Sequence, residues 1–252
     1  MPVLPGAEPF SHDVAGPGGE TGVLLSHGFT GSPQSMRPWA EHLASEGFSV
    51  RLPRLPGHGT SWPELNRTRF EDWYATIQQA FDELKQRCST VVVGGLSMGG
   101  TLVTKLAEDR GAEVAGIMVV NPAFRFEDWR LVALPALKWV VPATPAIGND
   151  IRKEGVEELA YPKTPLKALH SLVKACAVVV HDLPSVTQPL LLMRSAEDHV
   201  VPASGSALML SRVSSKDVTE VVLENSYHVA TLDNDAPQIF EMSAKFVRQV
   251  TA

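Results

Sequence analysis

The stretch T-V-V-V-G-G-L-S-M-G-G-T-L, Thr90 to Leu102, decides the fold of this chain. Its apolar start predicts a buried strand, and the residues from Gly99 onward predict a helix. Between them lies the G-x-S-x-G pattern of a nucleophile elbow, in which a serine occupies a sharp turn from strand to helix. Glycine at Gly95 and Gly99 lets neighbouring segments pack closely around the turn. We therefore expect Ser97 in a strained conformation at a helix N-terminus, where backbone N–H groups favour negative charge.

Apolar strands alternate with amphipathic helices on both sides of this elbow. Short apolar runs predict strands over residues 22–27, 48–52, 90–94, 114–121, 189–194 and 217–223. Helices are expected over residues 38–46, 70–87, 99–109, 203–212 and 236–250. Residues 1–21 predict an irregular or edge segment. This order is typical of an α/β fold with a mostly parallel sheet and helices on both faces.

One segment interrupts the alternation. Residues 122–188 are rich in proline and tryptophan and show no clear strand pattern. We interpret them as a cap inserted over the carboxyl edge of the sheet, so that residues 1–121 and 189–252 form the core. Within the cap, the apolar stretch from Leu131 to Val141 fits a plain helix, a surface that gathers lipid, or both.

The composition is that of an ordinary globular protein, with 252 residues, 44% of them hydrophobic and 20% charged. A net charge of -6 argues against a nucleic-acid partner, which needs a basic face. Cys88 and Cys176 lie far apart, without metal-binding or redox spacing, and favour a reduced, cytoplasmic protein. The N-terminus lacks the pattern of a signal peptide, and Leu131 to Val141 is too short to span a bilayer.

A serine hydroxyl becomes a good nucleophile when a histidine takes its proton and an acid orients that histidine. In hydrolases with a nucleophile elbow, the chain order is serine, acid, histidine, each in a loop after a strand. Asp198 and His228 follow the two strands predicted after the interruption. Glu197 and Asp182 are competing acids, and His199 and His181 are competing bases. The competing histidines fit the required order poorly, because they precede or adjoin the acid loop.

The negative charge that develops on an ester oxygen needs two backbone N–H donors. One is expected from Met98, directly after the nucleophile, and the other from Phe29 in the loop H-G-F-T-G. His27 and His58 fit structural roles at a strand end and in a turn.

Six motifs in order resemble the bacterial monoacylglycerol lipases, small carboxylesterases with the α/β-hydrolase fold. They are H-G-F-T-G-S-P-Q-S-M-R-P from His27, L-P-R-L-P-G-H-G-T from Leu52, G-L-S-M-G-G-T-L from Gly95, E-L-A-Y-P-K-T-P from Glu158, E-D-H-V-V-P from Glu197 and N-S-Y-H-V-A-T-L-D from Asn225. The resemblance covers nearly the whole chain and is weakest around residues 123–145 and 166–186.

This resemblance implies cofactor-free hydrolysis of one acyl chain from glycerol, with no metal. It implies Ser97 as nucleophile, Asp198 as acid and His228 as base, with Phe29 and Met98 as oxyanion donors. It also implies that Glu158 contacts the glycerol hydroxyls and that Ile147 lies near the acyl chain. The expected partner is a small lipid substrate, with peripheral contact to a membrane or micelle through the cap. The alternatives are a general carboxylesterase and a non-catalytic ligand receptor.

Overall fold

The computed structural model describes residues 1–15, 20–146 and 148–252. Seven strands form one sheet in the order β1-β3-β2-β4-β5-β8-β9. Their bounds are Phe10–His12 (β1), Thr21–Ser26 (β2), Ser49–Leu52 (β3), Thr90–Leu96 (β4), Gly116–Val120 (β5), Leu190–Ser195 (β8) and Val218–Leu223 (β9). β1 is an antiparallel edge strand, and the other neighbours pair in parallel. The predicted mostly parallel sheet is confirmed.

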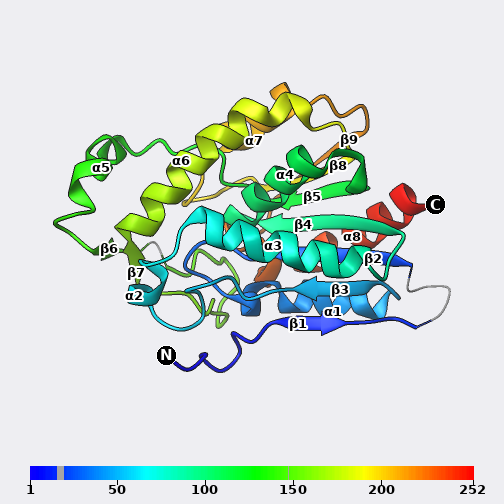
Figure 1. The fold of residues 1–252 in the computed structure, drawn as a ribbon, viewed down its shortest axis with the longest axis horizontal. Coiled ribbons are helices and arrows are strands. Elements are labelled where there is room, and N and C mark those ends of the chain that lie inside the picture. Colours follow the sequence, from blue (N-terminus) through cyan, green and yellow to red (C-terminus); the bar gives the residue numbers. More distant parts are fainter. Residues whose placement is uncertain (16–19, 147) are drawn as a thin grey trace.

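The helices alternate with these strands (Figure 1). The α-helices are Arg37–Ser45 (α1), Trp62–Leu65 (α2), Phe70–Lys85 (α3), Met98–Arg110 (α4), Leu134–Leu137 (α5), Leu166–Asp182 (α6), Ala203–Arg212 (α7) and Ala236–Thr251 (α8). Short 3-10 turns are Pro33–Met36 (η1), Gly111–Glu113 (η2), Trp129–Ala133 (η3), Leu183–Ser185 (η4) and Ala230–Leu232 (η5). The five helices expected from the sequence all form, with bounds that differ by at most two residues.

Successive side chains of β4 point to opposite faces of the sheet and into two separate cores. Val91 and Val93 pack in the cluster formed with α3, α4 and α6, whereas Val92 packs in the cluster formed with α1 and α8. A strand covered on both faces needs apolar residues at every position, which explains its continuous valine run. The sheet is thereby fixed between two helical layers, and its carboxyl edge is a rigid base for the loops that follow.

Residues 122–188 connect β5 to β8, which are adjacent in the sheet. This segment contains η3, α5, α6, η4 and an antiparallel pair of three-residue strands, Ala143–Pro145 (β6) and Lys163–Pro165 (β7). In Figure 1, α5, β6 and β7 lie at one end of the sheet, and α6 runs back across α3 and α4. The sequence shows no pattern for β6 and β7, because strands this short, each with a proline, have no alternation to detect. No helix among the described residues is long and apolar enough to cross a membrane.

Candidate active site

Ser97 lies between the end of β4 and the start of α4, with φ 56° and ψ -120°. This left-handed conformation is uncommon for a residue with a side chain and is held by the packing around it. A Cβ at Gly95 would lie 2.3 Å from the carbonyl carbon of Gly99, and a Cβ at Gly99 would lie 2.1 Å from the carbonyl oxygen of Ser26. Both positions therefore need glycine, and the serine is presented on a sharp turn as the motif predicts.

Asp198 and His228 lie in loops after β8 and β9, and both side chains are buried. Nδ1 of His228 lies 2.8 Å from Oδ2 of Asp198. The other carboxylate oxygen of Asp198 accepts the N–H groups of Val200 and Val201, each at 2.8 Å. Burial alone would raise the pKa of Asp198, but these hydrogen bonds and the nearby His228 hold the pKa below its usual value. The ionised carboxylate thus orients the imidazole through Nδ1 and leaves Nε2 available as a base.

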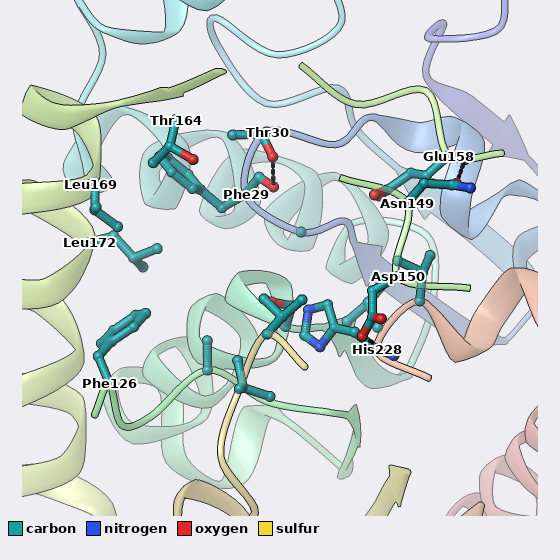
Figure 2. A pocket seen from close by; sticks show the side chains of 17 residues that line it. Phe29, Thr30, Phe126, Asn149, Asp150, Glu158, Thr164, Leu169, Leu172 and His228 are labelled. Atoms are coloured by element: carbon teal, nitrogen blue, oxygen red, sulfur yellow. Dashed lines mark hydrogen bonds between the residues drawn. The ribbon is translucent and has the colours of Figure 1, made fainter. Parts of the chain in front are cut away.

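Ser97 and His228 line one cavity of about 160 Å³, which also contains Glu158. Figure 2 shows that the labelled side chains divide its wall. The apolar side is formed by Phe126, Leu169 and Leu172, and the polar side by Asn149, Asp150 and Glu158. The site can therefore accept a ligand with one apolar and one polar end near the serine.

Glu158 is one of two acidic residues on the polar side, the other being Asp150. Burial raises the pKa of Glu158, while the charge of His228 and a hydrogen bond from Ser35 act in the opposite direction. A Cβ at Gly31 would lie only 2.6 Å from Oε1 of Glu158. The carboxylate thus occupies space that the loop after β2 leaves free by having glycine there.

Asn149 is a site residue that the sequence analysis missed. Its φ is 52°, its side-chain amide donates to the carbonyl of Val156 at 3.2 Å, and its Oδ1 accepts the N–H of Glu158 at 2.7 Å. Asparagine tolerates this left-handed conformation better than most residues. The dipeptide Gly148-Asn149 was the available signal of a tight turn.

Asp150, also missed, connects the loop that carries Asp198 and His199 to the loop that carries His228. One carboxylate oxygen lies 2.7 Å from Nδ1 of His199, and the other accepts the N–H of His228 at 3.1 Å. Its backbone carbonyl accepts the N–H of Val229 at 3.1 Å. The loop that carries Asn149 and Asp150 is therefore bound directly to the loop that carries His228.

The competing acids and bases have other partners. Glu197 contacts His199 at 3.1 Å, and Asp182 contacts His181 at 2.8 Å on the surface. The hydrogen bond to Asp150, followed by its charge, raises the pKa of His199. In the described part of the chain, Asp198 is the carboxylate hydrogen-bonded to the ring of His228.

The two expected oxyanion donors flank Ser97. Met98 is the first residue of α4, so its N–H has no partner one turn earlier in the helix. Phe29 lines the cavity, and its ring packs against Trp73 and His58 with centroids 5.8 and 6.2 Å apart. A Cβ at Gly28 would lie 3.4 Å from Cβ of Ser97, so this loop lies directly beside the elbow. Ile147 lies outside the described residues.

The sheet, the elbow and the Asp198–His228 pair define an α/β-hydrolase. The chain belongs to the family described as "Serine aminopeptidase, S33", whose model matches residues 20–235. It is 44% identical to the thermostable monoacylglycerol lipase of Bacillus sp. (strain H-257), over 97% of this chain and 96% of that protein. It is 24% identical to the carboxylesterase of Bacillus subtilis (strain 168), over 92% of this chain and 94% of that protein.

A solved structure from work on LipS and LipT, two metagenome-derived lipolytic enzymes, superimposes with a TM-score of 0.94. It is 46% identical in sequence and covers 98% of this chain and 100% of its own. These similarities confirm the α/β-hydrolase fold and the resemblance that the six motifs predicted.

Proposed function

We propose that this protein is a serine hydrolase that cleaves monoacylglycerols to glycerol and a free fatty acid. The observation that carries the proposal is the 2.8 Å hydrogen bond between Asp198 and His228, whose side chain lines the same cavity as Ser97. The 44% identity to a monoacylglycerol lipase supports the same substrate class.

The acylation step uses Ser97, His228 and Asp198, with Asp198 holding the imidazole of His228 in position. Oγ of Ser97 attacks the ester carbonyl carbon while Nε2 of His228 takes the hydroxyl proton. The N–H groups of Phe29 and Met98 donate to the oxyanion of the tetrahedral intermediate. The imidazolium then protonates the departing glycerol oxygen, and an acyl-enzyme remains. Water, deprotonated by His228, attacks that ester, and collapse of the second intermediate returns the proton to Ser97 and releases the fatty acid.

The divided wall of the cavity supports a monoacylglycerol. The carboxylate of Glu158 accepts hydrogen bonds from the glycerol hydroxyls, and Phe126, Leu169 and Leu172 hold the first part of the acyl chain. An ester without such hydroxyls leaves a buried carboxylate unpaired, which costs binding energy. Residues 122–188 thus act as a cap that selects the alcohol and the acyl chain, and the place of Ile147 beside the acyl chain stays a prediction.

A general carboxylesterase is the second candidate, favoured by the similarity to the Bacillus subtilis enzyme. The two are separated by kcat/KM for a monoacylglycerol and for the methyl ester of the same acid. We expect Glu158→Gln to lower the value for the monoacylglycerol about tenfold, or ~1.4 kcal/mol, and to leave the methyl ester unchanged. The exposed Glu154→Gln is the matched control. An equal loss on both esters would favour the carboxylesterase.

The nucleophile is tested directly by Ser97→Ala. We expect hydrolysis to fall by at least about 10³-fold and labelling by a fluorophosphonate to disappear, because the reacting oxygen is gone. The exposed Ser211→Ala is the control. Retained esterase activity in Ser97→Ala would refute the proposed chemistry, and a wild-type protein that neither labels nor hydrolyses esters would favour a ligand receptor.

The surface of the cap supports contact with lipid. Four large apolar side chains there are strongly exposed: Trp129 (82%), Val132 (87%), Trp139 (72%) and Val140 (83%). Exposed aromatic and aliphatic groups on one segment are typical of a surface that meets a membrane or micelle. The cytoplasmic location stays a prediction from the cysteine usage and the N-terminal sequence.

A further inference from the structure

A second cavity, of about 430 Å³, lies between the start of α3, the end of α5 and one side of α6. It shares no lining residue with the cavity of Ser97. Four basic side chains line it, and Glu71 is the single carboxylate in its wall. The basic side chains are Arg69, Lys138, Lys167 and Lys174.

These four side chains concentrate positive charge on a protein whose net charge is -6. Some cations elsewhere in the described chain are paired, such as Lys105 with Asp109 at 2.7 Å and Arg110 with Asp82 at 2.7 Å. Among the described residues, none of the four forms an ion pair within 4.0 Å. Like charges held together repel one another, so the groove stabilises an anion placed among them.

His170 and Trp139 hold two of the three ammonium groups in place, those of Lys138 and Lys167. Nζ of Lys138 lies 2.9 Å from Nδ1 of His170. Burial, and then the charges of Lys138, Lys174 and Arg69, lower the pKa of His170. The neutral imidazole therefore accepts a hydrogen bond from Lys138.

The indole of Trp139 provides the second fixed contact. Nζ of Lys167 and Nζ of Lys138 lie 4.8 and 5.5 Å from its ring centroid. Two elements thus place their cations on one aromatic ring, and fewer side-chain rotations are lost when an anion binds.

We propose that this groove binds a phosphate group. Four cations against one carboxylate favour an anion that carries close to two charges, and a phosphate monoester does so at neutral pH. Its oxygens accept from several ammonium and guanidinium groups at once. The rim includes the exposed apolar groups Trp139 (72%) and Val178 (53%), which fit a phosphate carried on a lipid head group as well as a free phosphate.

Titration with inorganic phosphate tests whether the groove binds a phosphate group at all. The C–H signals of His170 are followed by NMR while phosphate replaces chloride at constant ionic strength. We expect a saturable shift and a rise in the pKa of His170, because the anion offsets the neighbouring positive charges. The double variant Lys167→Ala/Lys174→Ala should lose at least tenfold in affinity, and the control Lys216→Ala/Lys245→Ala, in exposed lysines elsewhere, should keep it.

Binding to vesicles distinguishes a phosphate on a lipid head group from a soluble phosphate. The hydrolytically inactive Ser97→Ala protein is mixed with phosphatidylcholine vesicles that contain phosphatidic acid, or oleic acid at equal surface charge. At least tenfold tighter binding to phosphatidic acid, lost in the lysine double variant, assigns the site to a lipid phosphate. A response to inorganic phosphate without that preference assigns it to a soluble phosphate.

Two results together would overturn the proposal. They are no saturable phosphate effect on His170, and equal vesicle binding by the double and control variants. Because Ser97 takes no part in these measurements, their outcome is independent of whether the protein hydrolyses monoacylglycerols.

Discussion

At the residue scale, the turn at Ser97 brings backbone segments so close together that Gly95 and Gly99 leave no room for a Cβ atom. We expect Gly99→Ala to lower the free energy of unfolding by at least about 2 kcal/mol, because its Cβ would lie 2.1 Å from the carbonyl oxygen of Ser26. Urea unfolding measures the loss. Gly205→Ala in α7 is the matched control, since the nearest atoms to its Cβ lie at 3.6 Å. Equal stability of the two variants would show that β2 and α4 can separate without cost.

A single methyl group can test the position of Glu158 without changing its charge. The φ of Gly31 is not in the left-handed region, so alanine is allowed there, but its Cβ would lie 2.6 Å from Oε1 of Glu158. We expect Gly31→Ala to displace the carboxylate and lower kcat/KM for a monoacylglycerol about tenfold, with methyl-ester turnover retained. A loss shared by both esters would mean that the loop carrying Phe29 had moved instead.

At the scale of elements, a buried carboxylate binds the loop that carries Asn149 and Asp150 to the loop that carries His228. Asp233 accepts the N–H groups of Arg152, Lys153 and Tyr227 at 2.7, 2.9 and 2.9 Å. We expect Asp233→Asn to weaken these bonds, to cost about 1–3 kcal/mol of stability and to speed hydrogen exchange at residues 150–153 and 227–229. Asp217→Asn, after α7, is the control. Unchanged exchange at both segments would show that Asp150 alone holds the loops together.

At the scale of the whole molecule, two buried histidines couple stability to pH. His27 and His58 are fully buried, with ring centroids 5.0 Å apart. Nδ1 of His27 faces the carbonyl of Gly28 at 3.0 Å, while Nε2 accepts the N–H of Leu55 at 3.2 Å. Burial dominates and lowers the pKa of His27 from 6.5 to about 4. Protonation at Nε2 would remove the bond from Leu55.

The direction of the pH effect follows from that lowered pKa. Between about pH 6.5 and pH 4 the unfolded chain binds a proton at His27 and the folded chain does not, so stability falls as the pH falls. The full effect is of order 3 kcal/mol. Urea unfolding from pH 7.5 to 4.5 should show this slope, reduced in His27→Gln and kept in the exposed His12→Gln. The contribution of Asp198, whose pKa is lowered, is present above its unfolded value of 3.8 and is lost at still lower pH.

The core of the fold was predictable because local pattern and tertiary role agree there. The valine run of β4 is apolar at every position because both faces are covered, and the G-x-S-x-G pattern requires the turn at Ser97. Asp198 and His228 were predictable from chain order and from their position in loops after predicted strands. Asn149 and Asp150 were not, because their roles depend on partners such as His199 and His228, far away in sequence.

The adjacency of β5 and β8 has a consequence for the evolution of this scaffold. Ile117 of β5 pairs with Leu190 of β8. The segment 122–188 therefore begins and ends next to two neighbouring strands of the sheet. The intervening segment joins two neighbouring strands, and doubling the length of a flexible connection costs only about 0.6 kcal/mol. Segments of different size and chemistry can therefore be exchanged at this junction without changing the order of the strands, provided that they keep a contact to the His228 loop like that of Asp150. The same hydrolytic machinery can acquire new substrates by recombination at two adjacent points.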